Sequence, residues 1–250
     1  MFRELVGADK PDVVRFTNDD VKRITAGTQF KNPFDATKFD QSRLLPQLLL
    51  DANYCVIHLG KGDHAFVRAR NQVYCPLSEP SKVLDWPCRM SPLNGIESSE
   101  AWLFSFTFNH RIIHHYLWGV VSENPMIFTQ KRANYPVSFK IGHIELSSPR
   151  LQFEMDGCLY LESRNEVVVF EVKNGERTDF NSCQLYFPFR YFRYLQGVGT
   201  LDIRLHIRLV DAVRNVRRGW IDFHEFRFAE EVDLSSIELV SNGRYILMRV

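Results

Sequence analysis

The order of apolar and polar positions predicts two neighbouring strands in the middle of the chain. Residues 166–173 are mostly β-branched, aromatic or apolar, a composition typical of a buried strand. Residues 153–162 form a second apolar run, and the polar residues 163–166 supply a turn between the two runs. The pattern therefore predicts a β-hairpin, which we centre on Arg164 and Asn165.

The N-terminal third of the chain predicts two helices followed by a hairpin. One helix spans residues 18–25, and a second begins at Asp40 or Ser42 and carries leucines at helical spacing. Two strands, over residues 54–59 and 64–68, flank a glycine-rich tip. Helix, helix, hairpin is the order of a winged helix-turn-helix, whose second helix enters the major groove of DNA. A plain α+β subdomain with a solvated basic face is the alternative.

The segments on either side of the central hairpin carry helical signals. Residues 76–95 contain four prolines and predict a linker or an extended loop. Residues 96–122 predict one long helix or two short ones, and residues 179–196 predict another helix. Because Pro188 has no backbone N–H to donate, we expect a kink or a break at that position.

Strands dominate the C-terminal part. Residues 200–210 alternate strictly between apolar and polar side chains, which is typical of a strand with one apolar face and one basic face. A further strand over 219–228 and a hairpin over 236–249, turning at residues 241–243, complete the expected elements. The fold class predicted is α/β (α+β), with a central mixed sheet flanked by helices.

The elements group into three parts: a winged-helix-like subdomain over 1–75, a linker over 76–95 and a main domain over 96–250. A chain of 250 residues is long enough for one large domain or two small ones. The 45% of hydrophobic residues and 24% of charged residues are ordinary for a globular protein. Because the net charge is only +1, any surface that binds nucleic acid must concentrate its positive charge locally.

Cysteine usage and hydropathy bear on the cellular location. The five cysteines show no close pairing, which argues against a disulfide framework and favours a reducing cytoplasm. No apolar run reaches 18 residues, and the first residues lack the apolar core of a signal peptide. We therefore expect a cytoplasmic protein with no membrane partner.

Three charged residues stand out because they accompany the two apolar strands. Around the expected turn, Asp156 falls opposite Lys173, and Cys158 falls opposite Glu171. Opposed residues share a face of a sheet, so Asp156, Glu171 and Lys173 should project together, within roughly 5–8 Å of one another. Two carboxylates at that separation suit Mg²⁺, which usually takes one or two carboxylates and keeps several waters.

The pattern of Asp156, Glu171 and Lys173 resembles the PD-(D/E)XK nuclease superfamily, and its type II restriction endonucleases in particular. The resemblance covers roughly residues 153–196, about a fifth of the chain, and Met155 stands where the family name has proline. It implies a restriction-endonuclease-like fold in which Asp156 and Glu171 bind Mg²⁺. It further implies a homodimer that cuts double-stranded DNA, and a prokaryotic cell.

Two further residues come from the same resemblance. A glutamine on the helix after the active-site strand supports the metal site in some members, and Gln184 is the corresponding position. An additional acidic residue on the first helix corresponds to Glu100. Matching of the helix dipole explains an acidic residue at the start of that helix equally well.

Basic residues in both halves are candidates for contacts with phosphates. For the basic residues in the second half, the competing explanation is a solvent-exposed edge strand whose arginines prevent aggregation. His110 and His114 are four residues apart, but without a third ligand nearby we interpret them as surface or packing histidines rather than a zinc site. The candidate DNA-binding residues are Lys31, Lys38, Arg43, Lys61, Arg68, Arg204, Arg208, Arg217 and Arg218.

Three functions follow from these patterns. The first is a Mg²⁺-dependent type II restriction endonuclease that hydrolyses double-stranded DNA at a short specific site. The second keeps the same nuclease core in a repair or resolvase role. The third is a non-catalytic, winged-helix DNA-binding regulator in which the three charged residues cluster by chance.

Overall fold

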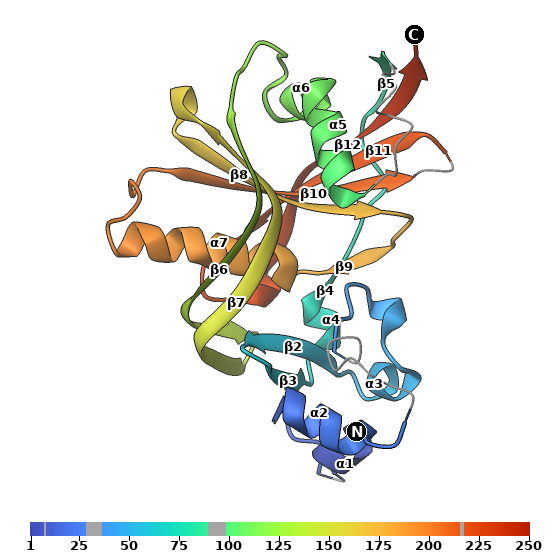
Figure 1. Cartoon of the computed structure of the whole chain (residues 1–250), viewed down its shortest axis with the longest axis vertical. Coiled ribbons are helices and arrows are strands. Elements are labelled where there is room, and N and C mark those ends of the chain that lie inside the picture. Colours follow the sequence, from blue (N-terminus) through green and yellow to red (C-terminus); the bar gives the residue numbers. More distant parts are fainter. Residues whose placement is uncertain (8, 29–36, 90–98, 216–217) are drawn as a thin grey trace.

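A seven-stranded mixed sheet forms the centre of the computed structural model, which describes residues 1–7, 9–28, 37–89, 99–215 and 218–250 (Figure 1). Two neighbouring pairs in this sheet are parallel, β8 with β10 and β5 with β12, and the others are antiparallel. The expected mixed sheet with flanking helices is confirmed. In order across the sheet, the strands are β5 (Val83–Cys88), β12 (Ile237–Arg249), β11 (Trp220–Phe228), β10 (His206–Asn215), β8 (Glu166–Asn174), β7 (Ile144–Leu161) and β6 (Met126–Ile141).

Helices cover both faces of the sheet, and strand β8 packs against both layers. Val167 and Val169 belong to the core on the side of helix α7 (Cys183–Gly197). Val168, Phe170 and Val172 belong to the core beneath helices α5 (Glu100–Asn109) and α6 (Ile112–Trp118). Because side chains alternate along a strand, β8 is buried on both faces, as its apolar sequence predicts.

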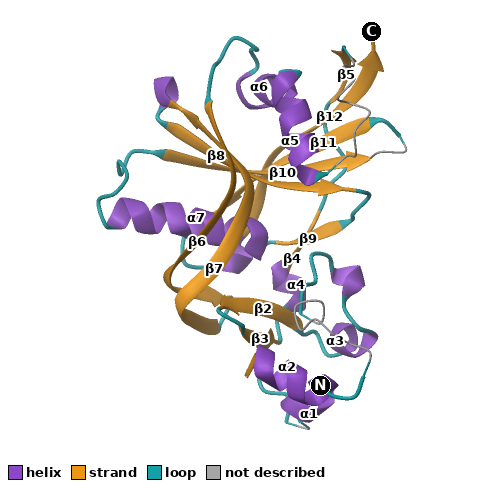
Figure 2. Cartoon of the chain, viewed as in Figure 1, coloured by secondary structure: helices purple, strands orange, loops and turns teal. Residues whose placement is uncertain are grey.

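The N-terminal part is a small three-stranded antiparallel sheet with short helices around it (Figure 2). Its apolar core is continuous with the core on the α7 side of the large sheet, so the two parts do not fold around separate cores. The pair β4 (Tyr74–Pro76) and β9 (Asp179–Asn181) also joins them. The remaining elements are α1 (Phe2–Val6), β1 (Val13–Thr17), α2 (Asn18–Thr25), η1 (Ser42–Leu44), α3 (Gln47–Asp51), β2 (Cys55–Gly60), β3 (Asp63–Val67), α4 (Arg70–Val73), η3 (Glu162–Arg164) and η4 (Leu234–Ser236).

The small sheet meets the large one where β2 crosses the long strand β7. Ser148 donates its hydroxyl to the carbonyl oxygen of Leu59. Gly60 adopts a φ of 93°, and a Cβ at this position would collide with the carbonyl oxygen of Arg150. Only glycine adopts this backbone conformation without strain and leaves room for the backbone of Arg150. Gly60 therefore allows strand β2 to pack directly against strand β7.

Several expected elements near strand β8 differ from the structure. The helix expected over 179–196 begins at Cys183, because residues 179–181 pair with β4 as strand β9. Pro188 lies inside that helix, which continues to Gly197 without ending at the proline. Of the kink or break predicted at Pro188, the break is wrong, and the kink stays a prediction: the loss of one backbone hydrogen bond is tolerated in a helix whose face is buried by tertiary packing.

Other corrections concern the strands. The expected strand over 200–210 begins only at His206, and residues 200–205 form turns and bends in which Ile203 is 70% exposed. The expected hairpin over 236–249 is the single strand β12, which pairs with β11 along its length. Part of the expected linker over 76–95 is strand β5, which extends the large sheet.

The N-terminal elements match the expectation in part. The helix over 18–25 and the hairpin of β2 and β3 are present. The second helix is shorter than its leucine spacing indicates, because α3 has only five residues. The additional strand β1, which the sequence analysis missed, pairs with β3. The winged-helix assignment stays a prediction.

Among the described residues, no helix is both long enough and apolar enough to cross a membrane.

The close contact of α5 with β7 yields a test of the packing. The ring of Phe104 lies over Gly157, where an added Cβ would be 2.5 Å from it. We expect Gly157→Ala to lower the free energy of unfolding by about 1–3 kcal/mol, because Phe104 must move. Denaturant unfolding monitored by circular dichroism measures this change. Gly197→Ala, at a helical position with no atom near the new Cβ, is the matched control and should not destabilise the protein. Equal stability of the two variants would contradict the packing.

Candidate active site

The register of β7 and β8 places two carboxylates side by side. The last paired residues are Gly157 and Phe170, so Asp156 and Glu171 come next on their strands. The expected register, with Asp156 opposite Lys173, is wrong by two residues, because the turn includes the 3₁₀ helix η3 and Asn165 in a left-handed conformation. A shift of two preserves the face on which each side chain projects, so the carboxylates still share one face.

The ammonium of Lys173 lies between three carboxylates. Its Nζ is 2.8 Å from Glu171 Oε1, 3.0 Å from Glu100 Oε1 and 3.9 Å from Asp156 Oδ2. Asp156 also accepts a hydrogen bond of 2.8 Å from the backbone N–H of Val172. The structure thus brings together the residues that the sequence pattern singled out, and we call these four residues the carboxylate–lysine cluster.

Two helices place the outer members of the site. Glu100 is the first residue of α5, whose N-cap Ser99 accepts a hydrogen bond from the backbone N–H of Trp102. Gln184, in the first turn of α7, donates from Nε2 to Glu171 Oε1. Its Oε1 is buried without a hydrogen-bond partner among the described residues. Gln184 therefore fixes the orientation of Glu171 and presents a spare oxygen in the same region.

Burial and charge act in opposite directions on the cluster. Burial raises the pKa of Glu171 to about 7, against the opposing influence of Lys173. Burial likewise raises the pKa of Asp156 above its ordinary value, with Lys173 again opposing the shift. For Lys173, burial favours the neutral amine, but Glu171 and Asp156 overcome this effect and raise its pKa. The site therefore holds more carboxylate than one ammonium can neutralise, which favours an additional cation.

The donor set fits Mg²⁺. Asp156 and Glu171 offer oxygen atoms on one face of the sheet, and Mg²⁺ usually binds one or two carboxylates together with waters and substrate phosphates. Within the described ranges, no group of three or more His, Cys, Asp and Glu side chains is arranged to hold a metal ion. A bound Mg²⁺ would therefore take its remaining ligands from water and substrate.

A buried ion pair lies behind Glu171. Asp211 on β10 is in register with Glu171 on the parallel strand β8, and it pairs with Arg177. Both side chains are almost completely buried, and the guanidinium also lies over the ring of Phe180, 5.4 Å from its centroid. Arg177 thereby supplies positive charge near the site. This charge, like that of Lys173, opposes the rise in the pKa of Glu171 that burial causes.

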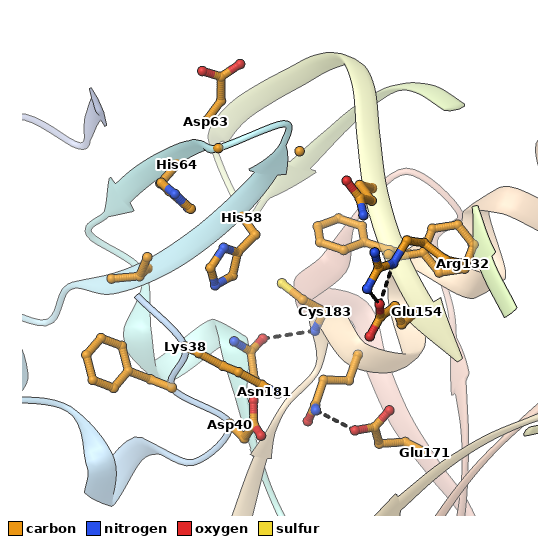
Figure 3. A pocket seen from close by; sticks show the side chains of 18 of the residues that line it. Lys38, Asp40, His58, Asp63, His64, Arg132, Glu154, Glu171, Asn181 and Cys183 are labelled. Atoms are coloured by element: carbon orange, nitrogen blue, oxygen red, sulfur yellow. Dashed lines mark hydrogen bonds and ion pairs between the residues drawn. The ribbon is translucent and has the colours of Figure 1, made fainter. Parts of the chain in front are cut away.

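The carboxylate–lysine cluster opens into a cleft of about 800 Å³ between the large sheet and the N-terminal part. Figure 3 shows the hairpin with His58 and His64 on the opposite side of this cleft from Glu171. The segment with Lys38 and Asp40 also lines it. Both parts of the chain therefore contribute to the space in which a substrate would meet the carboxylates.

The structure gathers only some of the candidate DNA-binding residues around this cleft. Lys38 and Lys61 line it, whereas Lys31 and Arg217 lie outside the described residues. The others lie elsewhere, and most are paired with carboxylates. They are Arg43, hydrogen-bonded to Glu176 O; Arg68, paired with Asp12; Arg204, paired with Asp202; Arg208, paired with Glu225; and Arg218, 3.7 Å from Glu176.

The two histidines considered for zinc have packing roles. His114 is fully buried and is hydrogen-bonded through Nε2 to Arg111. The ring of His110 stacks on Phe106 at 4.2 Å between centroids, and its Nε2 contacts the carbonyl oxygen of Arg89. These contacts agree with their interpretation as packing histidines.

Sequence reasoning missed the buried ion pair and the histidines of the cleft. Arg177 follows a polar turn and shows no sign of burial in the sequence. Asp211 carried a usable signal, because it is a lone carboxylate in the otherwise apolar run 209–213. His58 and His64 lie in the predicted hairpin, but their proximity to Glu171 depends on how the two parts of the chain dock.

Comparisons with known proteins identify families without an assigned activity. Residues 70–246 match the family model described as "Domain of unknown function (DUF6997)". Residues 6–66 match the model described as "Domain of unknown function (DUF6996)". No curated protein and no solved structure matches the chain.

The buried imidazole of His64 predicts a pH dependence of stability. Burial lowers the pKa of His64 to about 4, below the ordinary 6.5, so the folded state binds fewer protons than the unfolded state in acid. Its contribution to stability is therefore complete above pH 6.5 and is lost as the pH falls toward 4. At pH 5 this loss amounts to about 2 kcal/mol. Between pH 7.5 and 5, the free energy of unfolding of His64→Gln should therefore fall by about 2 kcal/mol less than that of the wild type. Denaturant unfolding at the two pH values measures the difference, and equal decreases in the variant and the wild type would contradict the prediction.

Proposed function

The chain belongs to the DUF6997 family, and from the geometry of its site we propose that it is a Mg²⁺-dependent nuclease that hydrolyses phosphodiester bonds in DNA. The observation that supports this proposal is the convergence of Asp156, Glu171 and Lys173 at the floor of a cleft. An acid pair with an adjacent lysine is the arrangement that the PD-(D/E)XK resemblance implies.

Each residue has a distinct role in the proposed reaction. Asp156 and Glu171 would hold the Mg²⁺ ion. When bound, Mg²⁺ stabilises charge on the phosphate and makes a coordinated water more acidic. Lys173 directs its ammonium toward the attacking water and offsets the negative charge that develops on the phosphorus oxygens. The water attacks the phosphorus in line with the leaving 3′ oxygen. The bond between phosphorus and the 3′ oxygen breaks, and the phosphate stays attached to the 5′ oxygen.

The supporting residues limit the freedom of these groups. Gln184 holds Glu171 by a hydrogen bond, and the Val172 N–H holds Asp156. Glu100 contacts Lys173 from the opposite helix layer and adds to the effect of Glu171 and Asp156, which raise the pKa of its ammonium. Catalytic groups held in one geometry by their neighbours avoid the entropic cost of ordering during the reaction.

More specifically, we propose a type II restriction endonuclease. It would act as a cytoplasmic homodimer that cuts double-stranded DNA at a short specific site. Its support is the resemblance of the same three residues and a fold in which the N-terminal part shares an apolar core with the large sheet that carries them. A repair or resolvase role would use the same cluster and would differ in the DNA structure that is cut.

Cleavage assays with site variants test the proposal. The purified protein should nick or cut DNA in Mg²⁺ and lose activity in EDTA, with supercoiled plasmid, linear duplex and single-stranded circles as substrates. Lys173→Ala and Asp156→Asn should each lower the rate at least about 100-fold, because each removes a charge on which the transition state depends. Gel electrophoresis at several times measures the rate.

A matched lysine distinguishes a local effect from a general loss of charge. Lys140 pairs with Glu230, 2.9 Å away, and does not line the cleft. Lys140→Ala should cleave at the wild-type rate. If Lys173→Ala and Asp156→Asn cut as fast as the wild type, the cluster is not the active site. DNA binding without Mg²⁺-dependent nicking would favour the non-catalytic regulator.

A further inference from the structure

The size of the cleft bears on the form of DNA that reaches the carboxylate–lysine cluster. The side chains of Glu171 and Lys173 are only 7% and 16% exposed, and they face a cleft of about 800 Å³. Sites of ~300–1,000 Å³ are typical of small ligands. One or two nucleotides fit such a space, whereas a double helix would lie across its opening with both strands still stacked. The limited access to Lys173 therefore favours, as the bound form, a DNA strand that has separated from the double helix.

The wall opposite the cluster carries two histidines beside the charged residues Asp40, Lys61 and Asp63. His64 is 2% exposed, shares a hydrogen bond of 2.8 Å between its Nε2 and Asn18 Oδ1, and has a buried Nδ1 without a partner among the described residues. Burial lowers the pKa of both His58 and His64, so their imidazoles are neutral at pH 7. Gln152 lines the same cleft. Neutral donors and acceptors of this kind match the edge of a nucleobase better than a phosphate.

Aromatic rings lie in the same cleft. Phe39, Phe153 and Phe187 line it, and Phe39 is the most exposed of the three. Proteins that bind single strands stack bases on such rings, and each stacked base contributes about tenfold or more to affinity. Rings and neutral polar groups together can hold a base whose stacking in the double helix has been lost.

Two basic side chains line the same cleft. Lys61 is exposed at the tip of the β2–β3 hairpin, and Lys38 is exposed on the neighbouring segment. In Figure 3, Lys38 lies beside Asp40 and Asn181, and Arg132 is paired with Glu154. Lys38 and Lys61 can therefore contact phosphates on either side of a base bound between them.

We propose that this cleft binds DNA as an unstacked single strand, with a base held beneath the β2–β3 hairpin while its phosphate reaches the carboxylate–lysine cluster. The proposal rests on the proposed nuclease function and specifies its substrate. The strand comes either from a single-stranded region or from a nucleotide flipped out of a duplex, and the two sources share the same bound form.

Binding in EDTA tests this proposal without cleavage. Fluorescence anisotropy compares a labelled single-stranded oligonucleotide with the blunt duplex of the same sequence. A set of duplexes with 2-aminopurine at successive positions reports loss of stacking as increased fluorescence. We expect either at least tenfold tighter binding of the single strand, or duplex binding accompanied by increased 2-aminopurine fluorescence. The first result identifies a single-stranded region as the source, and the second identifies a flipped nucleotide.

Two variants locate the contact in the cleft. Phe39→Ala should weaken binding of the single strand about tenfold, and Gln152→Ala, at an exposed position, should weaken it with no effect on folding. Phe128→Ala removes a ring that is 51% exposed and does not line the cleft, and it should bind as the wild type does. Thermal unfolding of each variant shows that the fold is retained.

The outcomes separate this proposal from the nuclease function. Equal binding of duplex and single strand, without increased 2-aminopurine fluorescence, would overturn the proposal. Binding that neither Phe39→Ala nor Gln152→Ala weakens would overturn it as well. In either case, Mg²⁺-dependent cleavage that requires Lys173 would leave the nuclease function intact. Single-strand binding through the cleft in a protein that cuts no DNA would support the binding mode while removing the nuclease function.

Discussion

Burial of strand β8 on both faces is the constraint on which the rest of the structure depends. Its valines alternate between two cores, one beneath α5 and one beneath α7. A charged residue in such a strand needs compensating partners. Glu171 has them in Lys173, Gln184 and the nearby Arg177. The site is thus the place where a doubly covered strand changes from apolar to charged, and the partners of its charges come from both helix layers.

The second constraint is the close docking of the N-terminal part on β7. Gly60 lets the small sheet approach the backbone of Arg150, and the two parts share one apolar core. Without this docking, the carboxylate–lysine cluster would be open to solvent on the side that now faces the β2–β3 hairpin. With it, the hairpin of β2 and β3 forms the opposite wall of a cleft. The shape of the site is therefore a property of the whole chain, although its reactive groups come from the central hairpin and α5.

The sequence was most informative where local periodicity and burial agree. The apolar runs of β7 and β8 predicted both strands and the shared face of Asp156 and Glu171, even though the register was wrong by two residues. Prediction failed where tertiary context decides: Pro188 remains inside a packed helix, and Asn242 and Gly243 lie within a paired strand. Neither the position of Arg177 nor the wall of the cleft follows from local pattern, because both depend on contacts between distant segments.

The ion pair of Arg177 and Asp211 has a consequence for how this site can change. Removing one partner of a buried pair leaves an uncompensated charge, whereas replacing both by apolar residues of similar volume is often tolerated. Substitutions at Arg177 and Asp211 are therefore coupled. A change at one position is compatible with the fold only when the other position changes with it. Since Asp211 lies in register beside Glu171, that coupling also restricts how the residues around the carboxylate–lysine cluster on strand β8 can vary.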